Sequence, residues 1–528
     1  MDTKALRQKI LDLAIRGKLV PQDPNDEPAS VLLDRIRAEK QQMVEDGRLK
    51  AKDIKNDTVI FVGEDNLHYE KYADGTVKCI EDEIPFEIPE GWAWSRLLPL
   101  TIKIGAGSTP TGGAAVYSNS GIKFIRSQNV YDEGLVLDDV AFISEEINKN
   151  KSGSIVRAKD ILLNITGGSI GRSALVPDNF DIANINQHVI IIRLVDDGLR
   201  FFLHNVIISP YIQNQILSRQ VGSGRGGLSA ETLSTFLIPV PPVHEQDRIR
   251  CKAESGLALV AQIAHDEDSI VAHISKCKER ILNLAIRGQL VPQDPDDEPA
   301  AVLLERIRAE KEELIKQGKI KRDKRESVIF RGEDNSYYLR TGDLVESLSD
   351  WGFDDLPDSW DVCCLGEVCD YGNCENVEAS AIEESAWILD LEDIEKDTGK
   401  ILARIKKAER KSASTKHRFH KGQVLYSKLR PYLNKVVLAD QNGYCTSEIL
   451  PLEFNSIIHP EFARYYLMSP TFLRYANRCS YGVKMPRLGT EDGKKAIVPV
   501  PPINEQAEIV DRIHSVFFYL DSITASLE

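Results

Sequence analysis

The stretch LAIRGKLVPQDPNDEPASVLLDRIRAEK, residues 13–40, returns at residues 284–311 as LAIRGQLVPQDPDDEPAAVLLERIRAEK. By direct comparison, 24 of the 28 positions are identical. Self-similarity across such a separation indicates a fold built from equivalent parts. The repeat therefore decides how the whole chain of 528 residues is divided.

The repeat continues outward from this stretch. The further matches, first copy and then second, are TVIFVGEDN (58–66) with SVIFRGEDN (327–335), IPEGWAW (88–94) with LPDSWDV (356–362), and IPVPPVHEQDRI (238–249) with VPVPPINEQAEI (498–509). Between its Pro-x-x-Trp and its Pro-Val-Pro-Pro, each half carries about 145 residues that do not repeat closely. The frame is duplicated and its two fillings have diverged.

These matches predict seven segments. They are an N-terminal helical repeat (1–55), a linking β-hairpin unit (56–91), a first variable domain (92–240), a central long helix with the second helical repeat (243–321), a second linking unit (322–359), a second variable domain (360–500) and a C-terminal coiled-coil helix (503–528). In the first linking unit, the sequence YADGTV (72–77) predicts a β-hairpin, because Asp-Gly favours the tight turns of hairpins.

The central segment predicts one long helix. Residues 244–288 contain no proline, and mostly apolar residues recur at alternating spacings of three and four from Ile249 to Leu284, interrupted by Glu267. This spacing is typical of a coiled-coil seam, and such a helix would be about 65 Å long. Gly17 and Gly288, each followed shortly by proline, are expected to end the helices that precede them.

The two ends of the chain together resemble one further copy of the long helix. By the repeat, position 528 corresponds to 268 and position 1 to 272. We therefore expect two long antiparallel helices, one continuous and one assembled from both ends of the chain, related by a pseudo-two-fold axis. The amphipathic helices that follow each Pro-Gln-Asp-Pro turn, 29–47 and 300–318, either cover these long helices or bind a partner.

The two variable domains share a strand skeleton. AKDILLNITGGSIGRSALV (158–176) can be laid over KGQVLYSKLRPYLNKVVLA (421–439), and each domain ends in a helical segment. Under the common pattern the side chains differ, so that Thr166 and Arg172 stand where the second copy has Leu429 and Lys435. One scaffold that presents different side chains is suited to recognising two different DNA sequences.

Charge is distributed unevenly along the chain. The net charge is -15, yet residues 92–240 and 360–500 each sum to +1, so the acidity lies in the frame. Residues 400–435 hold 12 Lys and Arg and a single acid, which suits a phosphate backbone. No stretch reaches the roughly 18 to 20 apolar residues of a membrane span, and the first residues do not resemble a signal peptide, so we expect a cytoplasmic protein.

Catalytic and metal motifs are weak in this sequence. Cys363, Cys364, Cys369 and Cys374 crowd together without the C-x-x-C pairs of structural zinc sites, so they are interpreted as reduced thiols. We find no Asn/Asp-Pro-Pro-aromatic tetrapeptide of an amino-methyltransferase and no phosphate-binding loop of the Walker type. GSGRGG (222–227) fits G-x-G-x-x-G but closes no βαβ unit. We expect no catalytic residue, metal or cofactor in this chain.

In this order of motifs the chain resembles the specificity subunit of type I restriction-modification systems. The resemblance rests on two variable domains, each opening near Pro-x-x-Trp (89–92 and 357–360) and closing with PVPPxxEQ (239–246 and 499–506). It implies an α+β fold with two α/β target-recognition domains separated by a pair of long antiparallel coiled-coil helices. It further implies a non-catalytic subunit that reads a bipartite double-stranded DNA site, with the helices as a ruler for the gap.

The resemblance also implies partners. Two methyltransferase subunits would bring S-adenosylmethionine for adenine-N6 methylation, and restriction subunits would bring ATP and Mg²⁺. Two alternatives stay open, a coiled-coil scaffold with two protein-binding domains that does not bind DNA, and a self-contained methyltransferase.

Polar loop residues beside strands and the basic run are the candidate DNA contacts. They are Ser108, Thr109, Thr111, Arg126, Gln128, Asn129, Thr166, Ser169, Arg172 and Arg225 in the first domain, and Lys406, Lys407, Arg410, Lys411, Ser414, Lys416, Arg418, Lys428, Arg430, Lys484 and Arg487 in the second. Arg and Gln can contact base edges bidentately, whereas Lys more often neutralises phosphate. The cluster at 404–418 is the strongest of these predictions.

Overall fold

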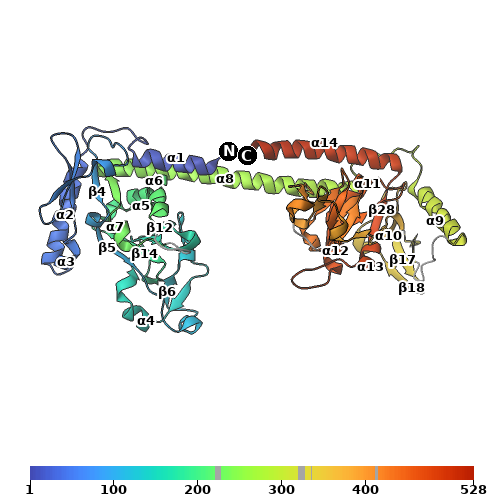
Figure 1. The fold of residues 1–528 in the computed structure, drawn as a ribbon, viewed down its shortest axis with the longest axis horizontal. Helices are drawn as coiled ribbons and strands as arrows, with labels where there is room; N and C mark the ends of the chain where they lie inside the picture. The colour runs from blue at the N-terminus through green and yellow to red at the C-terminus, as the bar shows by residue number, and fades with distance from the viewer. Residues whose placement is uncertain (220–226, 319–326, 335, 411–413, 528) are drawn as a thin grey trace. The chain divides into compact units, whose positions relative to one another are not determined.

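The computed structural model describes residues 1–219, 227–318, 327–334, 336–410 and 414–527. The chain divides into two compact units, Met1–Asp266 and Glu267–Glu528 (Figure 1). Each unit contains one copy of the repeated frame and one variable domain. Among the described residues, no helix is both long and apolar enough to cross a membrane.

The first unit is mixed α and β. Its helices are α1 (Thr3–Ile15), α2 (Ala29–Glu45), α3 (Ala51–Ile54), α4 (Glu145–Asn150), α5 (Arg200–Ile208), α6 (Pro210–Ser218), α7 (Ala230–Ser234) and the first part of α8 (Val243–Ala285). Its strands are β1 (Val59–Val62), β2 (His68–Lys71), β3 (Val77–Cys79), β4 (Ala93–Arg96), β5 (Thr101–Ala106), β6 (Ile122–Ile125), β7 (Val130–Tyr131), β8 (Gly134–Leu135), β9 (Ala141–Ile143), β10 (Ile155–Val156), β11 (Ile161–Asn164), β12 (Ser173–Leu175), β13 (Ala183–Ile185), β14 (Val189–Leu194) and β15 (Leu237–Val240).

The second unit is also mixed α and β. Its helices are the last part of α8, α9 (Ala300–Lys316), α10 (Leu365–Val368), α11 (Pro460–Met468), α12 (Pro470–Cys479), α13 (Thr490–Lys494) and α14 (Ile503–Leu527). Its strands are β16 (Ser327–Arg331), β17 (Tyr337–Thr341), β18 (Leu344–Ser347), β19 (Asp361–Cys364), β20 (Asn376–Val377), β21 (Trp387–Leu389), β22 (Ile405–Lys406), β23 (Lys416–Phe419), β24 (Val424–Ser427), β25 (Val436–Leu438), β26 (Gly443–Thr446), β27 (Ile449–Leu452) and β28 (Ile497–Val500).

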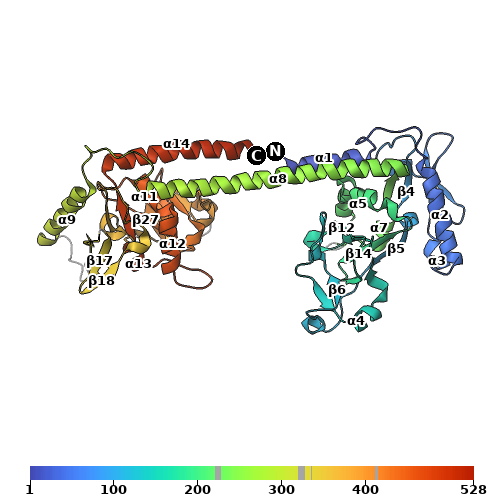
Figure 2. The ribbon, with the colours of Figure 1, turned by 180° about the vertical axis from the view of Figure 1, so that it is seen from behind.

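The long helix is confirmed as α8, a single helix of 43 residues. In the first unit α1 lies along its beginning, and the two helices approach so closely that a Cβ added to Gly256 would lie 3.2 Å from Cδ1 of Ile10 (Figure 1). In the second unit α14 lies along its end, where Lys278 forms an ion pair with Asp521 (Figure 2).

The predicted seam of α8 is buried only in part. Ile249 and Ala253 are fully buried at the start of the helix and Ile274 is buried near its end, where Ile281 and Leu284 are half-buried. Ile270, also in the seam, is 40% exposed. The helix pairs are therefore established within each unit, whereas a continuous coiled coil is not.

The glycines end their helices as predicted. Helix α1 stops at Ile15, Gly17 adopts a φ of 63°, and the backbone N–H of Lys18 closes the helix by donating to the carbonyl of Leu13 over 2.9 Å. Gly288 has a φ of 66° and ends α8 in the same way. Glycine adopts this left-handed conformation without the steric cost that a Cβ brings.

Each variable domain contains two sheets of three or more strands, and each of these sheets has its own core. In the first unit the inner sheet, β12-β11-β14-β5, packs with α5 and α6 on the frame. The outer sheet, β10-β13-β6-β9, forms a second core away from the frame. The second unit has β25-β24-β27 and β20-β23-β26-β21-β22 in these places. In both units the outer sheet contains one parallel pair, β13 with β6 and β26 with β21.

The shared strand skeleton is confirmed in register. Ile161 pairs with Leu175 between β11 and β12, and Val424 pairs with Leu438 between β24 and β25, as the alignment of the two sequences requires. The helical segment that closes each domain is broken into two helices, because a proline begins α6 and α12. Proline cannot donate the backbone hydrogen bond of a helix interior and is tolerated in the first turn.

The linking units are small three-stranded sheets, β1-β2-β3 and β16-β17-β18. The predicted hairpin at 72–77 is confirmed, since Tyr72 donates its N–H to the carbonyl of Thr76 and Gly75 adopts a φ of 87°. The neighbouring amphipathic helices α2 and α9 bury their apolar faces in the core of their own unit. Leu32 of α2 shares a core with Trp92, and Leu303 of α9 shares one with Trp360.

Candidate nucleic-acid interface

The two variable domains contain the same crossing of two loops at one end of the inner sheet. In the first domain the N–H of Leu228 donates to the carbonyl of Ile165 over 2.9 Å. In the second, the N–H of Leu488 donates to the carbonyl of Lys428 over 3.0 Å. Isolated bridges beside these bonds join Thr166 with Gly227 and Leu429 with Arg487. The backbone is thus alike at this crossing, and the side chains differ.

In the first domain, four polar side chains form a hydrogen-bonded row there. The side-chain Oε1 of Gln187 accepts from the N–H of Thr109 over 3.1 Å, and its Nε2 lies 3.2 Å from Nε2 of His188. Nδ1 of His188 lies 2.6 Å from Oγ1 of Thr166. Thr109 and Gln187 are exposed, and the other two are half-buried. The row presents donors and acceptors on a fixed frame, which is what the edges of bases require.

The loop after β6 supplies a second polar group. Arg126 donates from Nη2 to the carbonyl of Asp139 over 3.1 Å, and exposed Gln128 reaches the side chain of Asp139 over 3.3 Å. Asn129 is 2% exposed, and its amide serves the backbone of Arg126 and of Val136. The prediction of Asn129 as a DNA contact is therefore corrected, because its side chain closes the loop from inside.

The remaining candidates of the first domain lie at or near the surface. Exposed Ser108 accepts from Nζ of Lys151 over 2.6 Å, and Thr111 is exposed. Ser169 is half-buried and accepts from the amide of Asn164. Arg172 is exposed and stacks its guanidinium 4.8 Å from the ring centroid of Tyr131.

In the second domain, a hairpin between Tyr481 and Arg487 crosses over the turn that follows β24. Backbone bonds of 3.1 and 3.0 Å join its two ends. Arg487 contacts both carboxylate oxygens of Glu448, at 2.8 to 3.1 Å, and this contact lowers the pKa of Glu448. At the tip, Val483 has a relative exposure of 102% and Lys484 is exposed.

The turn beneath this hairpin is strained. Arg430 and Asn434 adopt φ angles of 50° and 48°, a left-handed conformation that costs non-glycine residues energy. Between them Tyr432 is 49% exposed, and the N–H of Arg430 is held by the carbonyl of Pro486 over 2.7 Å. Lys428 and Arg430 are half-buried beside it. Such strain is found preferentially at functional sites.

Part of the basic run of the second domain is neutralised by acids from elsewhere in the fold. Arg410 lies 3.0 Å from Asp390 and 2.6 Å from Asp393, with side-chain exposures of 14%, 27% and 4%. Lys407 donates to Glu384 over 2.9 Å. Arg410 is therefore part of the domain's interior framework, whereas Lys407 is held by an acid at the surface.

Lys416 requires a correction. It is 3% exposed, and its Nζ lies 3.2 Å from Oγ of exposed Ser414 and 3.9 Å from Oδ1 of Asp390. A side chain enclosed in this way is not available to a phosphate. Lys406 remains exposed, as does Arg418, which forms an ion pair of 3.3 Å with Glu375. Arg225 and Lys411 lie outside the described residues.

The cysteine cluster is buried in the core of the second unit. Cys363, Cys364 and Cys369 are buried and Cys374 is half-buried. Burial raises the pKa of Cys364 to about 12, which keeps this thiol protonated. Within the described residues, no group of three or more His, Cys, Asp or Glu side chains could hold a metal ion.

Four members of these surfaces were missed by reasoning on the sequence. They are Gln187, His188, Tyr432 and Glu448. Gln187 and His188 directly precede the apolar strand β14, and Glu448, which directly precedes β27, is the counterpart of His188 in the second copy. Their position at equivalent strand starts was a usable indication, but only the fold brings them beside Thr166 and Arg487.

Comparisons with known proteins agree with these features. Residues 89–250 and 357–527 match the family model described as "Type I restriction modification DNA specificity domain". The EcoAI specificity subunit of Escherichia coli is 28% identical over 433 residues, which are 70% of this chain and 63% of that subunit. The EcoEI specificity subunit of Escherichia coli is 28% identical over 412 residues, 69% of this chain and 61% of that subunit. The chain thus matches less than two thirds of the length of these relatives.

A solved structure has a similar fold. It comes from work on complex assembly and conformational transition of the type I R-M system. The two chains are 17% identical, with a TM-score of 0.53 over 84% of this chain and 94% of the other. At this identity the likeness concerns the fold alone.

Proposed function

The chain belongs to the type I restriction-modification DNA specificity family, and from this premise we propose that it is the non-catalytic subunit that reads a bipartite double-stranded DNA target. In this proposal each variable domain is a target-recognition domain that contacts one half of the site. The protein acts in the cytoplasm, and it positions adenine-N6 methyltransferase subunits that carry S-adenosylmethionine.

One observation supports the proposal most directly. Both domains use the same backbone crossing, yet one presents Thr166, His188 and Gly227 where the other presents Leu429, Glu448 and Arg487. Residues that served only to hold the crossing together would have no physical reason to differ so strongly in charge. A pair of readers for two different base sequences would have that reason, since base edges are distinguished by their pattern of donors and acceptors.

The contacts of the first domain are assigned by chemistry. Gln187 and Arg126 can each make two hydrogen bonds to a purine edge, and Arg172 can reach a phosphate or guanine. Ser108, Thr109, Thr111, Gln128, Thr166 and Ser169 complete the surface. His188 is included because it fixes Thr166 and Gln187 relative to each other.

In the second domain the hairpin is the central contact. Arg487, oriented by Glu448, is suited to guanine, and Val483 at the tip is suited to a thymine methyl group. Lys406, Ser414, Arg418, Lys428, Arg430 and Lys484 complete the proposed interface as contacts to the backbone of DNA. Asn129, Lys407, Arg410 and Lys416 are left out of the proposed interface.

The frame supplies the assembly functions. We assign α8, α1 and α14 the role of a coiled-coil spacer between the two target-recognition domains. The chain is divided into the seven segments that the repeats predict. Two methyltransferase subunits bind the frame, and restriction subunits that use ATP and Mg²⁺ join this complex. Because a target adenine must leave the duplex to be methylated, the methyltransferase extrudes it while this chain holds the flanking bases.

The test is selection from a random duplex library, with the chain produced together with a methyltransferase subunit and then alone. Two short motifs at one constant separation are expected, and exchanging a variable domain must exchange one motif. Adding seven residues to both long helices must lengthen the separation. Weak, salt-insensitive binding without a motif would favour the scaffold alternative, and binding of S-adenosylmethionine by the isolated chain would favour the self-contained methyltransferase.

A further inference from the structure

The two small linking sheets carry the same exposed aromatic pair. In the first, Phe61 of β1 lies opposite Tyr69 of β2, with ring centroids 5.9 Å apart and planes at 25°. In the second, Phe330 lies opposite Tyr338, at 5.8 Å and 24°. Phe61 is 41% exposed, and the other three rings are partly exposed.

Both pairs are held in one orientation by the same contacts. The hydroxyl of Tyr69 donates to Oδ2 of Asp65 over 2.7 Å, and that of Tyr338 donates to Oδ2 of Asp334 over 2.7 Å. A glycine makes room for each ring, because a Cβ at Gly63 would lie 2.8 Å from Tyr69. The corresponding distance in the second sheet is 2.7 Å. The rings are therefore ordered before any partner arrives.

The likeness extends over the rest of this outer face. Val77, 48% exposed, lies opposite Lys71, and Val345, also 48% exposed, lies opposite Arg340. Both basic residues are exposed. At the edge beside the tyrosines stand Cys79 in the first sheet and Ser347 in the second. Side chains alternate between the two faces of a strand, so these residues share the face of the aromatic pair.

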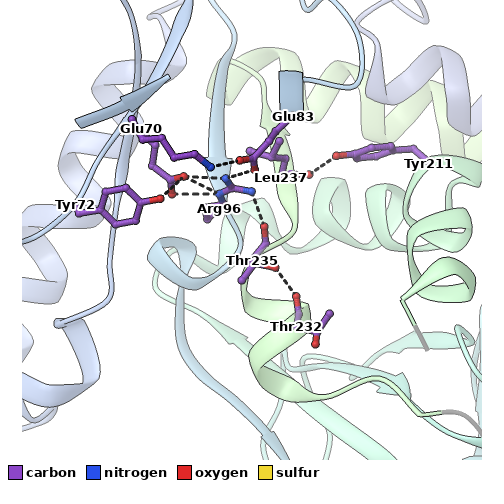
Figure 3. Close-up of polar contacts among 9 residues, drawn as sticks. Glu70, Tyr72, Glu83, Arg96, Tyr211, Thr232, Thr235 and Leu237 are labelled. Atoms are coloured by element: carbon purple, nitrogen blue, oxygen red, sulfur yellow. Dashed lines mark hydrogen bonds and ion pairs between the residues drawn. The ribbon is translucent and has the colours of Figure 1, made fainter. Parts of the chain in front are cut away.

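On the underside of the two sheets Ile60 and Ile329 are alike, but the anchor at the centre differs. In the first sheet Glu70, 3% exposed, and Glu83 bind the guanidinium of Arg96 at 2.8 and 2.7 Å, and Arg96 also donates to the carbonyl of Thr235 (Figure 3). In the second sheet the counterpart of Glu70 is Leu339, which packs in an apolar core. The polar anchor of one sheet is thus an apolar anchor in the other.

This pattern reverses the usual relation between the burial of a position and the variation of its residue. Buried positions are normally the ones that packing fixes, whereas exposed positions are free to vary. Here the buried anchor diverged between the copies and the exposed face did not. A partner that contacts both faces would keep them alike, and exposed aromatic rings beside a basic residue are typical of protein interfaces.

The charge of the linking units identifies the class of partner. The first linking unit, residues 56–91, contains ten Asp and Glu against two Lys and Arg, and the second, residues 322–359, contains ten against five. Such an acidic surface repels nucleic acid. A protein is the occupant that this surface fits, and two equivalent faces fit two copies of one protein.

We infer that each linking sheet docks one copy of the same methyltransferase subunit, through an apolar or aromatic side chain on the Phe-Tyr pair and a carboxylate on Lys71 or Arg340. This inference rests on the proposed function and names the surface by which its partner is held. It assigns the docking to the outer faces of β1-β2-β3 and β16-β17-β18, away from the DNA-reading loops.

The test counts subunits by native mass spectrometry on the full chain produced together with its methyltransferase subunit. The unchanged chain binds two copies, Phe61→Asp and Phe330→Asp each bind one, and the double variant binds none, with affinity per site reduced at least about tenfold. Leu344→Asp is the matched control. Leu344 is 59% exposed in β18 but belongs to the opposite face, and it must leave two copies bound.

A second measurement needs no disruptive substitution. Cys79 is exposed on the docking face, so its labelling by a maleimide, read on the peptide that contains it, must slow at least about tenfold in the complex. Ser347→Cys must show the same protection in the second sheet. Full occupancy by the double variant, or unprotected Cys79 in a complex with two copies, overturns the inference while the proposed function stands. If the unchanged chain binds no methyltransferase subunit, both fail, and the library selection still reports whether it reads DNA.

Discussion

The indole of Trp92 donates a hydrogen bond from Nε1 to Oε2 of Glu245 over 2.9 Å, across 153 residues of sequence. The second unit repeats this bond between Trp360 and Glu505 over 2.8 Å. The other carboxylate oxygen of Glu245 accepts from Gln22 over 2.8 Å. The three duplicated motifs, Pro-Gln-Asp-Pro, Pro-x-x-Trp and Pro-Val-Pro-Pro-x-x-Glu-Gln, therefore meet at one buried junction that closes each variable domain onto the frame.

Removing the indole donor should destabilise the junction. Trp92→Phe leaves an oxygen of a buried carboxylate without its partner, at a cost of about 1–3 kcal/mol beyond the loss of ring area. Trp94→Phe is the matched control, since Trp94 is 2% exposed and its Nε1 has no hydrogen-bond partner among the described residues. Urea unfolding of the two variants measures the difference, and equal destabilisation would contradict the assigned role of the bond.

The glycine at the junction should not tolerate a side chain. A Cβ at Gly17 would lie 2.4 Å from Cγ of Pro89 and would occupy a φ of 63°, so Gly17→Ala combines a steric clash with backbone strain. Gly47→Ala carries the strain alone, because its φ is 73° and nothing lies within 4 Å of the added atom. We expect Gly17→Ala to lose at least about 1 kcal/mol more. Thermal unfolding of both variants checks this, and similar losses would show that the proline yields.

The buried carboxyl of Glu245 should make stability depend on pH. Burial raises its pKa, despite the hydrogen bonds from Trp92 and Gln22 that lower it. The folded state then holds its proton at a higher pH than the unfolded state does, so the contribution of Glu245 is largest below its ordinary pKa of about 4.3 and declines as pH rises through the raised value.

Glu245→Gln isolates this effect. The unfolding free energy of the unchanged protein minus that of the variant should decrease as pH rises from about 4 to 7. A difference that is constant, or that increases with pH, would contradict the assignment. Glu505→Gln should behave alike in the second unit, because burial raises the pKa of Glu505 as well.

Paired and exposed basic residues of the second domain should act differently. Arg410→Ala leaves Asp393 without its cation and Asp390 with only the more distant Lys416, and it should lower the unfolding free energy by about 3 kcal/mol. Lys484→Ala should leave stability within about 0.5 kcal/mol of the original but reduce the slope of log affinity for the selected duplex against log salt by about 0.9. Fluorescence anisotropy at several salt concentrations checks the slope, and an unchanged slope would remove Lys484 from the interface.

The polar row of the first domain should carry specificity for one half-site. Gln187→Ala removes a side chain able to contact two atoms of a base, and it should cost about 1–3 kcal/mol at one position of one motif. Repeating the library selection with this variant measures the effect. The motif read by the second domain is the internal control and must stay unchanged, and relaxation of both motifs would indicate a loss of structure instead.

Local and periodic features could be predicted from the sequence alone. Spacing, proline exclusion and turn chemistry predict the duplicated frame, the uninterrupted helix α8 and the helix ends at Gly17 and Gly288. The same reading predicts that β11 and β24 are equivalent strands of the two copies. These rules act within a few residues, so a repeat read along the chain is sufficient to apply them.

Side-chain pairing over long distances was decided by the tertiary structure. The basic run at 400–435 holds one acid of its own, yet the fold brings Glu384, Asp390 and Asp393 against it and encloses Lys416. Asn129 is a polar residue that the fold buries, because its side-chain amide donates to the carbonyl of Val136. Charge and polarity determined which residues could meet DNA, and the packing of distant segments determined which of them are left free to do so.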